Sequence, residues 1–570
     1  MRHDRKPAQR NDQAGTRSQR YWVRPFIWIT LLALLLLAAS PTLLYPLTRD
    51  QGAYAYIADL MMQGGVPYRD AWDLKPPGVY FVYWLAFSLF GRSEFAVRLF
   101  DVLYTLLSAA VVYVLARAVF LDRSIAGLSA WLYALCYYLL VHFYSAANPE
   151  AFMVPFLAAC VYGMVCGVRS RSSHLLLLSG AAGGFAFWYK PTASTVVLAM
   201  LAWTGVVTWQ EHRKIEEVSR SLVAIIVGGL LGLLPIGLYL YGHGLGELLE
   251  LWRAYGTGAY LGAHGLALGD GPLAMLDVIV RYLRDWQLLV WLSLAGTFAV
   301  LARRQPDSAG AGPPPPTIWS DSAAVRRGEA VVVFLLSSLA AVIVQGKLFE
   351  YQWIPILAPA AILSAVCLTC LVQEIRGQPD RSWRDMRSIF AVVVIVGLLL
   401  WTGYDHSTRY RRLVAYLAGH MTAEQYYAQF DIGTDFSHTG TLRAATYLRE
   451  HTKADETALI WGAEPLVNFL AQRRSPTKYV FSYMLVGQAS SPRLEASRRE
   501  FIDDLQKVTP TYIVLVERDV TPLTPMGSRA QLDEFPAFRA ILETEYHFEI
   551  QVEDYLFYRS LGSETGFKPG

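Results

Sequence analysis

Long apolar runs recur along the first 404 residues of the chain, and short polar segments separate them. A membrane-spanning helix needs about 20 apolar residues, because each residue adds about 1.5 Å and the hydrocarbon layer is about 30 Å thick. The pattern therefore predicts a polytopic α-helical membrane protein with about eleven spans. The predicted spans are residues 26–47, 99–121, 124–143, 150–168, 174–188, 192–210, 221–241, 286–302, 329–346, 352–373 and 388–404.

The pattern changes after the last predicted span. Residues 405–570 are rich in charge and contain no apolar run of membrane length. Strand-like and helix-like segments alternate there, which is typical of a small α/β sheet with largely parallel strands. We expect helices at 439–451, 464–472 and 493–506 and strands at 458–461, 478–482 and 512–516.

Three parts follow from these patterns. A basic tail covers residues 1–25, and a transmembrane domain covers residues 26–404 with a first outer loop at 48–98. A soluble α/β domain covers residues 405–570. The turn Trp461–Pro465 in this domain ends a strand and opens a helix, a geometry that can bind an anion. No glycine-rich dinucleotide fingerprint accompanies it, so a plain strand-to-helix turn is the simpler interpretation.

Lysine and arginine are unevenly distributed between alternate loops. The basic tail and the loops on its side of the membrane hold 22 of these residues, whereas the opposite loops hold ten. Because cytoplasmic loops are enriched in Lys and Arg, we expect the N-terminus in the cytoplasm and the 405–570 domain outside. The protein is thus predicted to be a multi-pass protein of the cytoplasmic membrane.

The composition agrees with the prediction of a membrane protein and adds little to it. Hydrophobic residues make up 54% of the chain, above the ~45–50% of an ordinary soluble domain. The five cysteines all fall inside predicted spans, so neither a disulfide framework nor a zinc site is indicated. The net charge of +3 reflects membrane topology and gives no indication of nucleic-acid binding.

The first outer loop joins an aspartate to a lysine-proline-proline turn. Asp50 follows the first span in Arg-Asp-Gln-Gly-Ala-Tyr, and Lys75 opens Lys-Pro-Pro twenty-five residues later. This stretch resembles the first periplasmic loop of GT-C glycosyltransferases, the class that contains bacterial protein O-mannosyltransferases and the lipid A aminoarabinose transferase. Gln51 stands where the protein O-mannosyltransferases usually have glutamate. That difference favours the broader bacterial lipid A or envelope-glycan group.

The resemblance implies catalytic roles for two carboxylates. In GT-C enzymes an aspartate just outside the first membrane helix is catalytic, so Asp50 is expected to be the general base. Many of these enzymes carry a second acidic residue in the next outer loop, where this chain has Glu150. An isolated Asp50 would be an ordinary interfacial aspartate, and the start of a helix would by itself explain Glu150. The pair could also share a divalent cation, but no metal-ligand spacing is visible and no cofactor is required.

The resemblance further implies cations for the phosphate of a lipid-linked donor. The candidate phosphate-binding residues are Lys75, Lys190, Lys347, Tyr351 and Arg98. Each candidate cation lies at a predicted helix end, where snorkelling to the interface is the ordinary explanation. Asp70, Asp73 and Tyr54 are expected to orient the loop around Lys75, although Tyr54 could be a simple interfacial aromatic.

These features together predict an enzyme of cell-envelope glycosylation. We expect a hexosyl- or pentosyltransferase that moves a sugar from a polyprenyl-phosphate donor to a lipid, glycan or protein acceptor at the outer membrane face. A transporter or flippase of lipid-linked saccharides is the main alternative. Transporters place charged residues near the membrane midplane, whereas the charges here cluster at the outer rim. A polysaccharide polymerase or ligase is the nearest enzymatic alternative.

Overall fold

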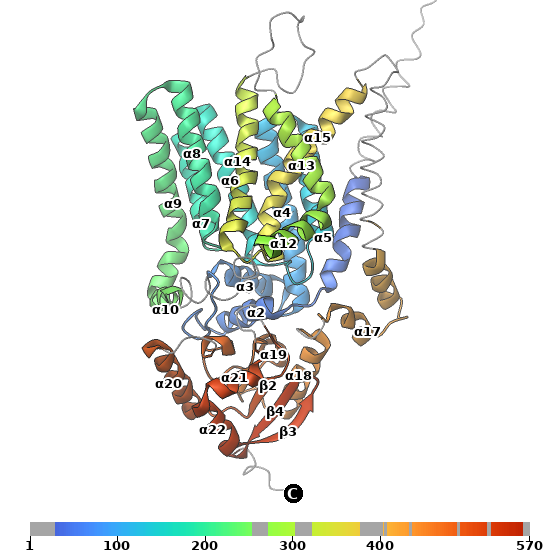
Figure 1. Cartoon of the computed structure of the whole chain (residues 1–570), viewed down its shortest axis with the longest axis vertical. Coiled ribbons are helices and arrows are strands. Elements are labelled where there is room, and N and C mark those ends of the chain that lie inside the picture. Colours follow the sequence, from blue (N-terminus) through green and yellow to red (C-terminus); the bar gives the residue numbers. More distant parts are fainter. Residues whose placement is uncertain are drawn as a thin grey trace, which may run out of the picture.

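A computed structural model describes most of the chain and shows a helix bundle joined to a small domain that contains a sheet (Figure 1). Two helices of the first outer loop lie between the bundle and this C-terminal domain. The described residues are 29–253, 272–302, 322–376, 403, 407–432, 436–486, 491–520 and 526–562.

The predicted spans within the described residues are all helical. The first forms the helical segment Ile29–Leu44, which ends in η1 (Ser40–Leu44). The predicted span 388–404 lies outside the described residues, apart from Gly403. The other spans correspond to α4 (Glu94–Phe120), α5 (Arg123–Leu140), α6 (Pro149–Ser170), α7 (Ser173–Phe187), α8 (Ala193–His212), α9 (Ile215–His243), α13 (Gln287–Leu301), α14 (Ser322–Gln345) and α15 (Leu357–Arg376).

Fewer described helices have the length and composition of a membrane span than the eleven spans that the sequence pattern predicts. Six of the described helical segments are long and apolar enough to cross a membrane, or seven if the bent pair Ile29–Leu44 and Arg49–Met62 is counted as one span. Helices α7 and α13 are apolar but shorter. The protein is therefore a multi-pass membrane protein, and the total of eleven spans stays a prediction.

Small residues allow α7 and α9 to pack closely. A methyl group on Gly180 would lie 2.0 Å from the carbonyl oxygen of Ile225, and one on Gly228 would lie 1.9 Å from that of Leu177. Glycine is therefore required at both positions, as is common where membrane helices approach closely.

The first outer loop contains two helices that the sequence analysis did not predict. Helix α2 (Arg49–Met62) follows a bend of 78° after the first span. Helix α3 (Gly78–Phe90) has 13 residues and reaches about 20 Å, which is too short to cross the hydrocarbon layer.

The C-terminal domain is α/β, as predicted, but its sheet is mixed. Strands β1 (Ala458–Trp461) and β2 (Tyr512–Val516) pair in parallel, whereas β4 (Tyr555–Ser560) pairs antiparallel with β2 and with β3 (Tyr546–Val552). The prediction of largely parallel strands is thus wrong, and so is the strand at 478–482, which has no partner in the four-stranded sheet of the described residues. The helices of the domain include α18 (His438–His451), α19 (Leu466–Ala471), α20 (Pro492–Lys507), α21 (Ser528–Gln531) and α22 (Pro536–Glu545).

The C-terminal domain packs directly on the first outer loop. The ring of Phe469 stacks on Phe87 of α3 with 5.4 Å between centroids, and the guanidinium of Arg92 lies over the same Phe469 ring. The backbone N–H of Trp72 donates to the carbonyl oxygen of Lys478 at 2.8 Å. Buried apolar residues of the bundle, the loop and this domain form one continuous cluster, so the loop is fixed from both sides.

Candidate active site

Asp50 is the second residue of α2 and lies at the bundle end that faces the C-terminal domain. The backbone N–H of Thr48 donates to Gln51 Oε1 at 3.0 Å, which caps the first turn of this helix. The Asp50 side chain is 41% exposed, and its Oδ2 lies 3.0 Å from Lys75 Nζ. The helix N-terminus and the Lys75 ammonium group both place positive charge beside this carboxylate.

Gln51 and Arg98 hold this helix start in place. Gln51 Nε2 donates to the carbonyl oxygens of Phe143 and Ala146, and Gln51 Oε1 accepts from Arg98 Nη2 at 2.8 Å. Arg98 is 1% exposed, and all three of its guanidinium nitrogens donate to protein oxygens, including those of Tyr45 and Pro46. Arg98 is therefore a structural residue of this loop, and its predicted contact with a phosphate does not fit the structure.

Lys75 is oriented by the groups around its backbone. The hydroxyls of Tyr68 and Tyr80 donate to the Lys75 carbonyl oxygen at 2.7 and 3.1 Å. Burial alone would lower the pKa of the Lys75 ammonium, but the carboxylate of Asp50 outweighs it, and the pKa is raised well above its usual value. Lys75 therefore stays charged.

Asp73 and Asp70 are hydrogen-bonded within the same loop. Asp73 accepts from the Tyr80 hydroxyl at 3.0 Å and from the backbone N–H of Leu74 at 2.7 Å. Asp70 accepts from the backbone N–H of Val66 and from Arg69. Burial raises the pKa of Asp73 to about 6, although the charge of Lys75 lowers it.

Glu150 forms a second pair with Lys190. Glu150 is the second residue of α6, as Asp50 is of α2, and it is ion-paired with Lys190 from the loop between α7 and α8. The two side chains are only 2% and 12% exposed. Burial lowers the pKa of Lys190, the charge of Glu150 opposes this shift, and the charge of Lys75 adds to it.

Tyr351 connects the two lysine–carboxylate pairs. It lies in η4 (Glu350–Ile356), and its ring centroid is 5.2 Å from Lys75 Nζ and 5.0 Å from Lys190 Nζ. Tyr54 borders the cluster, since its ring centroid is 6.0 Å from Lys75 Nζ and its hydroxyl is 3.4 Å from Oδ1 of Asn148, which precedes α6. Segments from four separate parts of the sequence therefore meet at one cluster.

Lys347 lies four residues before Tyr351. It is 4% exposed, and burial lowers the pKa of its ammonium group. Its predicted contact with a donor phosphate stays a prediction.

Two buried acidic residues near this cluster were not predicted from the sequence. Glu350 Oε1 accepts from the backbone N–H of His142 and lies 2.8 Å from His142 Nδ1. Asp101, near the start of α4, accepts from the Tyr137 hydroxyl at 2.8 Å. Asp101 lies within one predicted span and Glu350 just before another, so the sequence pattern does not distinguish them. Their contacts with Tyr137 and His142 form only in the folded protein.

A metal ion finds little support in this geometry. The described residues contain no group of three His, Cys, Asp or Glu side chains that could hold one. Asp50 and Glu150 each contact a lysine ammonium, an arrangement that does not suit a shared cation. The divalent cation between them stays a prediction, and no step of the proposed reaction is assigned to it.

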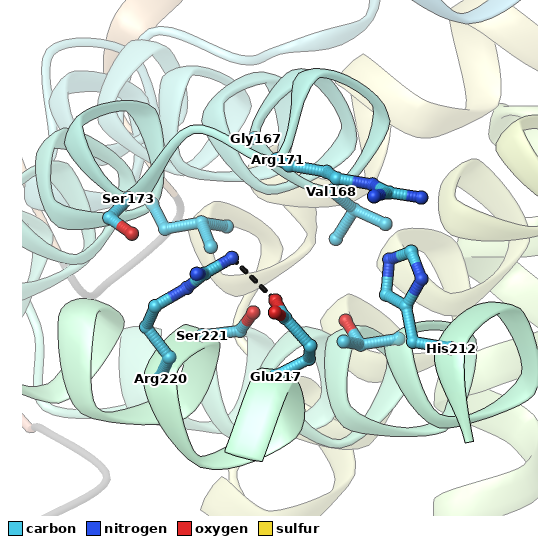
Figure 2. A pocket seen from close by; sticks show the side chains of 10 residues that line it. Gly167, Val168, Arg171, Ser173, His212, Glu217, Arg220 and Ser221 are labelled. Carbon is cyan, nitrogen blue, oxygen red and sulfur yellow. Dashed lines mark hydrogen bonds and ion pairs between the residues drawn. The ribbon is translucent and has the colours of Figure 1, made fainter. Parts of the chain in front are cut away.

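A small pocket lies at the opposite end of α6 (Figure 2). It is lined by Arg171, His212, Glu217 and Arg220, among others, and Arg220 is ion-paired with Glu217. Helix α6 has 22 residues and is about 33 Å long, which separates this pocket from Glu150. The pocket is therefore not part of the lysine–carboxylate cluster.

The chain is similar to known proteins in part of its sequence and in its fold. Residues 74–239 match the family model described as dolichyl-phosphate-mannose-protein mannosyltransferase. This range includes Lys75, Glu150 and Lys190 and begins after Asp50. No curated protein sequence matches the chain significantly.

Solved structures share the fold. ArnT from Cupriavidus metallidurans bound to undecaprenyl phosphate is 14% identical, with a TM-score of 0.55 over 96% of this chain and 99% of that one. The same protein in the apo state is 13% identical, with a TM-score of 0.53 over 97% of this chain and 100% of that one. The Archaeoglobus fulgidus oligosaccharyltransferase tethered with an acceptor peptide is 12% identical, with a TM-score of 0.50 over 94% of this chain and 74% of that one. The expected resemblance is therefore confirmed: this chain has the GT-C fold over nearly its whole length and matches a mannosyltransferase family model over residues 74–239.

Proposed function

We propose that this protein is a glycosyltransferase that moves a sugar from a polyprenyl-phosphate donor to an acceptor hydroxyl at the outer face of the cytoplasmic membrane. The half-exposed Asp50 carboxylate, paired with Lys75 beside a second lysine–carboxylate pair, is the observation that carries this proposal. The structure of ArnT with undecaprenyl phosphate supports the donor class, because its fold covers nearly the whole of this chain.

The two lysines suit an anionic donor. Lys75 and Lys190 lie beside the same Tyr351 ring, so a phosphate between their ammonium groups would meet two positive charges. Charged hydrogen bonds of this kind are about twice as strong as neutral ones. As the bond between the sugar and the phosphate breaks, the same charges would stabilise the phosphate that leaves.

Binding of the phosphate would also prepare the base. A phosphate that takes over Lys75 releases Asp50 from its ion pair, and the released carboxylate is exposed enough for an acceptor to reach it. The acceptor oxygen then attacks the anomeric carbon, the bond to the phosphate oxygen breaks, and Asp50 takes the hydroxyl proton. Polyprenyl phosphate leaves with the bonding electrons.

Glu150 is assigned a supporting role. It is 2% exposed and tied to Lys190, so a free acceptor has less access to it than to Asp50. We assign Glu150 to orienting Lys190 and the groups around Tyr351.

The position of these charges favours an enzyme over a transporter. A transporter needs charged groups or broken helices near the midplane. Asp50 and Glu150 instead lie in the first turn of their helices, and Arg49 and Gly52 beside Asp50 contact the C-terminal domain. A polymerase or ligase would use the same chemistry on a glycan acceptor.

The proposal is tested with purified protein and a panel of polyprenyl-phosphate sugars. Release of polyprenyl phosphate that depends on an added acceptor supports a transferase, and the glycosylated product identifies the acceptor class. Movement of intact donor across vesicle membranes without release of polyprenyl phosphate would instead establish the flippase alternative.

A further inference from the structure

The turn after β1 of the C-terminal domain binds a cation of the first outer loop. Glu464 in this turn lies next to Arg49, with 2.5 Å between Glu464 Oε1 and Arg49 Nε. Arg49 Nη1 also donates to the carbonyl oxygen of Val520 at 3.1 Å. The Glu464 and Arg49 side chains are only 2% and 17% exposed. Glu464 is a side chain of this turn and contacts Arg49, whereas the backbone N–H of Ala463 in the turn donates to the Asp519 carboxylate.

The turn that carries Glu464 is held firmly. Asp519 Oδ2 accepts from the backbone N–H of Ala463 at 2.8 Å and from the Ser528 hydroxyl at 2.6 Å. Asp519 Oδ1 accepts from the backbone N–H of Ser528 at 2.7 Å. These hydrogen bonds fix the backbone next to Glu464 and so restrict the position of its carboxylate.

The C-terminal domain contacts α2 a second time just beyond Asp50. A methyl group on Gly52 would lie 2.5 Å from Leu466 Cβ, so the two backbones are in direct contact there. Arg49 and Gly52 both belong to the first turn of α2, on either side of Asp50 in sequence. The segment that carries the Asp50 carboxylate is therefore fixed on both sides by one domain.

We propose that Glu464 is a positioning residue for Asp50, through which the C-terminal domain sets the geometry of the catalytic carboxylate by way of Arg49. This inference rests on the proposed role of Asp50 as the base. It gives the C-terminal domain a part in turnover, because a misplacement of about 1 Å can cost about a hundredfold in rate.

The charges around Glu464 make this contact sensitive to pH. Arg49, Asp519 and Tyr555 are the charged and titratable groups that act on Glu464. Burial raises the pKa of Glu464 to about 7, although the charge of Arg49 opposes the shift. The ion pair with Arg49 is accordingly complete above this pH and weakens below it, while the hydrogen bond remains.

Steady-state kinetics of Glu464→Gln test the proposal. We expect kcat to fall about tenfold or more per folded molecule, with the KM for a polyprenyl-phosphate sugar within about twofold of wild type. The part of the kcat profile that rises through about pH 7 should disappear. Glu545→Gln, an exposed carboxylate of the same domain, is the matched control and should match wild type. Wild-type kcat and pH profile in folded Glu464→Gln would overturn the proposal.

Two further sets of variants complete this test. If Glu464→Gln does not fold, Arg49→Lys is measured in its place, since it keeps the charge but loses the fork of donors. The reversed pair Arg49→Glu with Glu464→Arg should recover part of the lost kcat, whereas a purely structural role predicts no recovery beyond the gain in folded protein.

A readout without turnover separates this proposal from the proposed function. The rate at which a charged maleimide labels Asp50→Cys should change at least threefold when Glu464→Gln is added, and should not change with Glu545→Gln. An altered rate in a protein that releases no polyprenyl phosphate from any donor would leave the coupling standing and remove the glycosyltransferase assignment. An unaltered rate overturns the coupling.

Discussion

Asp50 and the donor phosphate should compete for the same ammonium group. In the structure Lys75 Nζ lies 3.0 Å from Asp50 Oδ2, so a phosphate that binds Lys75 must displace this carboxylate. Asp50→Asn removes the competing charge while it keeps the size of the side chain. It should therefore strengthen the binding of polyprenyl phosphate even as it slows turnover.

The exposure of the pair sets the size of the effect. Asp50 is 41% exposed, so water and salt screen the interaction, and pairs of this kind are worth about 0–1 kcal/mol. A gain of about 1 kcal/mol corresponds to about fivefold tighter binding. Lys75→Met should act in the opposite direction, because loss of a charge that contacts the phosphate costs about 2 kcal/mol or more, which is at least tenfold in Kd.

Calorimetric titration of polyprenyl phosphate into detergent-solubilised protein measures both effects. Asp503→Asn, which removes an exposed carboxylate on α20, is the control and should bind as wild type does. In a Lys75→Met background Asp50→Asn should bring no gain, because the contested ammonium is absent. Weaker binding by Asp50→Asn, or an equal gain in both backgrounds, would refute the competition.

Three other substitutions probe the surroundings of the pair. Glu150→Gln leaves the buried ammonium of Lys190 without its partner, so the unfolding temperature should fall, while turnover should suffer less than in Asp50→Asn. Asp73 has a folded pKa of about 6, above the ~3.9 of an unfolded aspartate, so its contribution to stability is full below about pH 4 and is lost as the pH rises through about 6. Asp73→Asn should remove this loss, which unfolding scans at about pH 3.5 and about pH 7.5 would detect. Gly52→Ala would ordinarily stabilise a helix by about 1 kcal/mol, but the contact with Leu466 should reverse the sign, and an increase in unfolding temperature would contradict the docking seen here.

Hydropathy predicted the membrane helices well, because the hydrocarbon thickness imposes a length that the sequence shows directly. The helices of the first outer loop were missed for the same reason. Helix α3 is apolar but has only 13 residues, and its buried side chains pack on α2 and α6 as well as on Phe469 of the C-terminal domain. A criterion based on the length of a membrane span does not detect so short a helix.

The sheet was predicted in part. Strands β1 and β2 are continuous apolar runs, and both are fully buried. The missed hairpin alternates in sequence at Tyr546, Phe548, Ile550 and Val552, but a register shift between Phe548 and Ile550 interrupts the alternation in the folded strand. A two-residue turn at Glu553 and Asp554 joins it to β4 without the usual asparagine or glycine, so the common hairpin signature is absent.

Residues of the lysine–carboxylate cluster were named from the sequence only where a motif contained them. Asp50, Lys75, Glu150, Lys190 and Tyr351 come together as one cluster although they lie far apart in the chain. Arg98 resembled the other cations at helix ends. In the structure its guanidinium donates to backbone carbonyl oxygens, and the local sequence gives no indication of these hydrogen bonds. The pairing of Arg49 with Glu464 joins residues 415 positions apart, which a single sequence cannot reveal.

The central claim is that the Asp50 carboxylate takes the proton of the acceptor. Single-turnover measurement of polyprenyl phosphate release, with donor bound and acceptor in excess, tests it most directly. Asp50→Asn should lower this rate by about 10²–10⁴-fold, the usual contribution of a positioned base, in protein that still binds polyprenyl phosphate. A rate near that of wild type in Asp50→Asn would contradict the mechanism proposed for this protein.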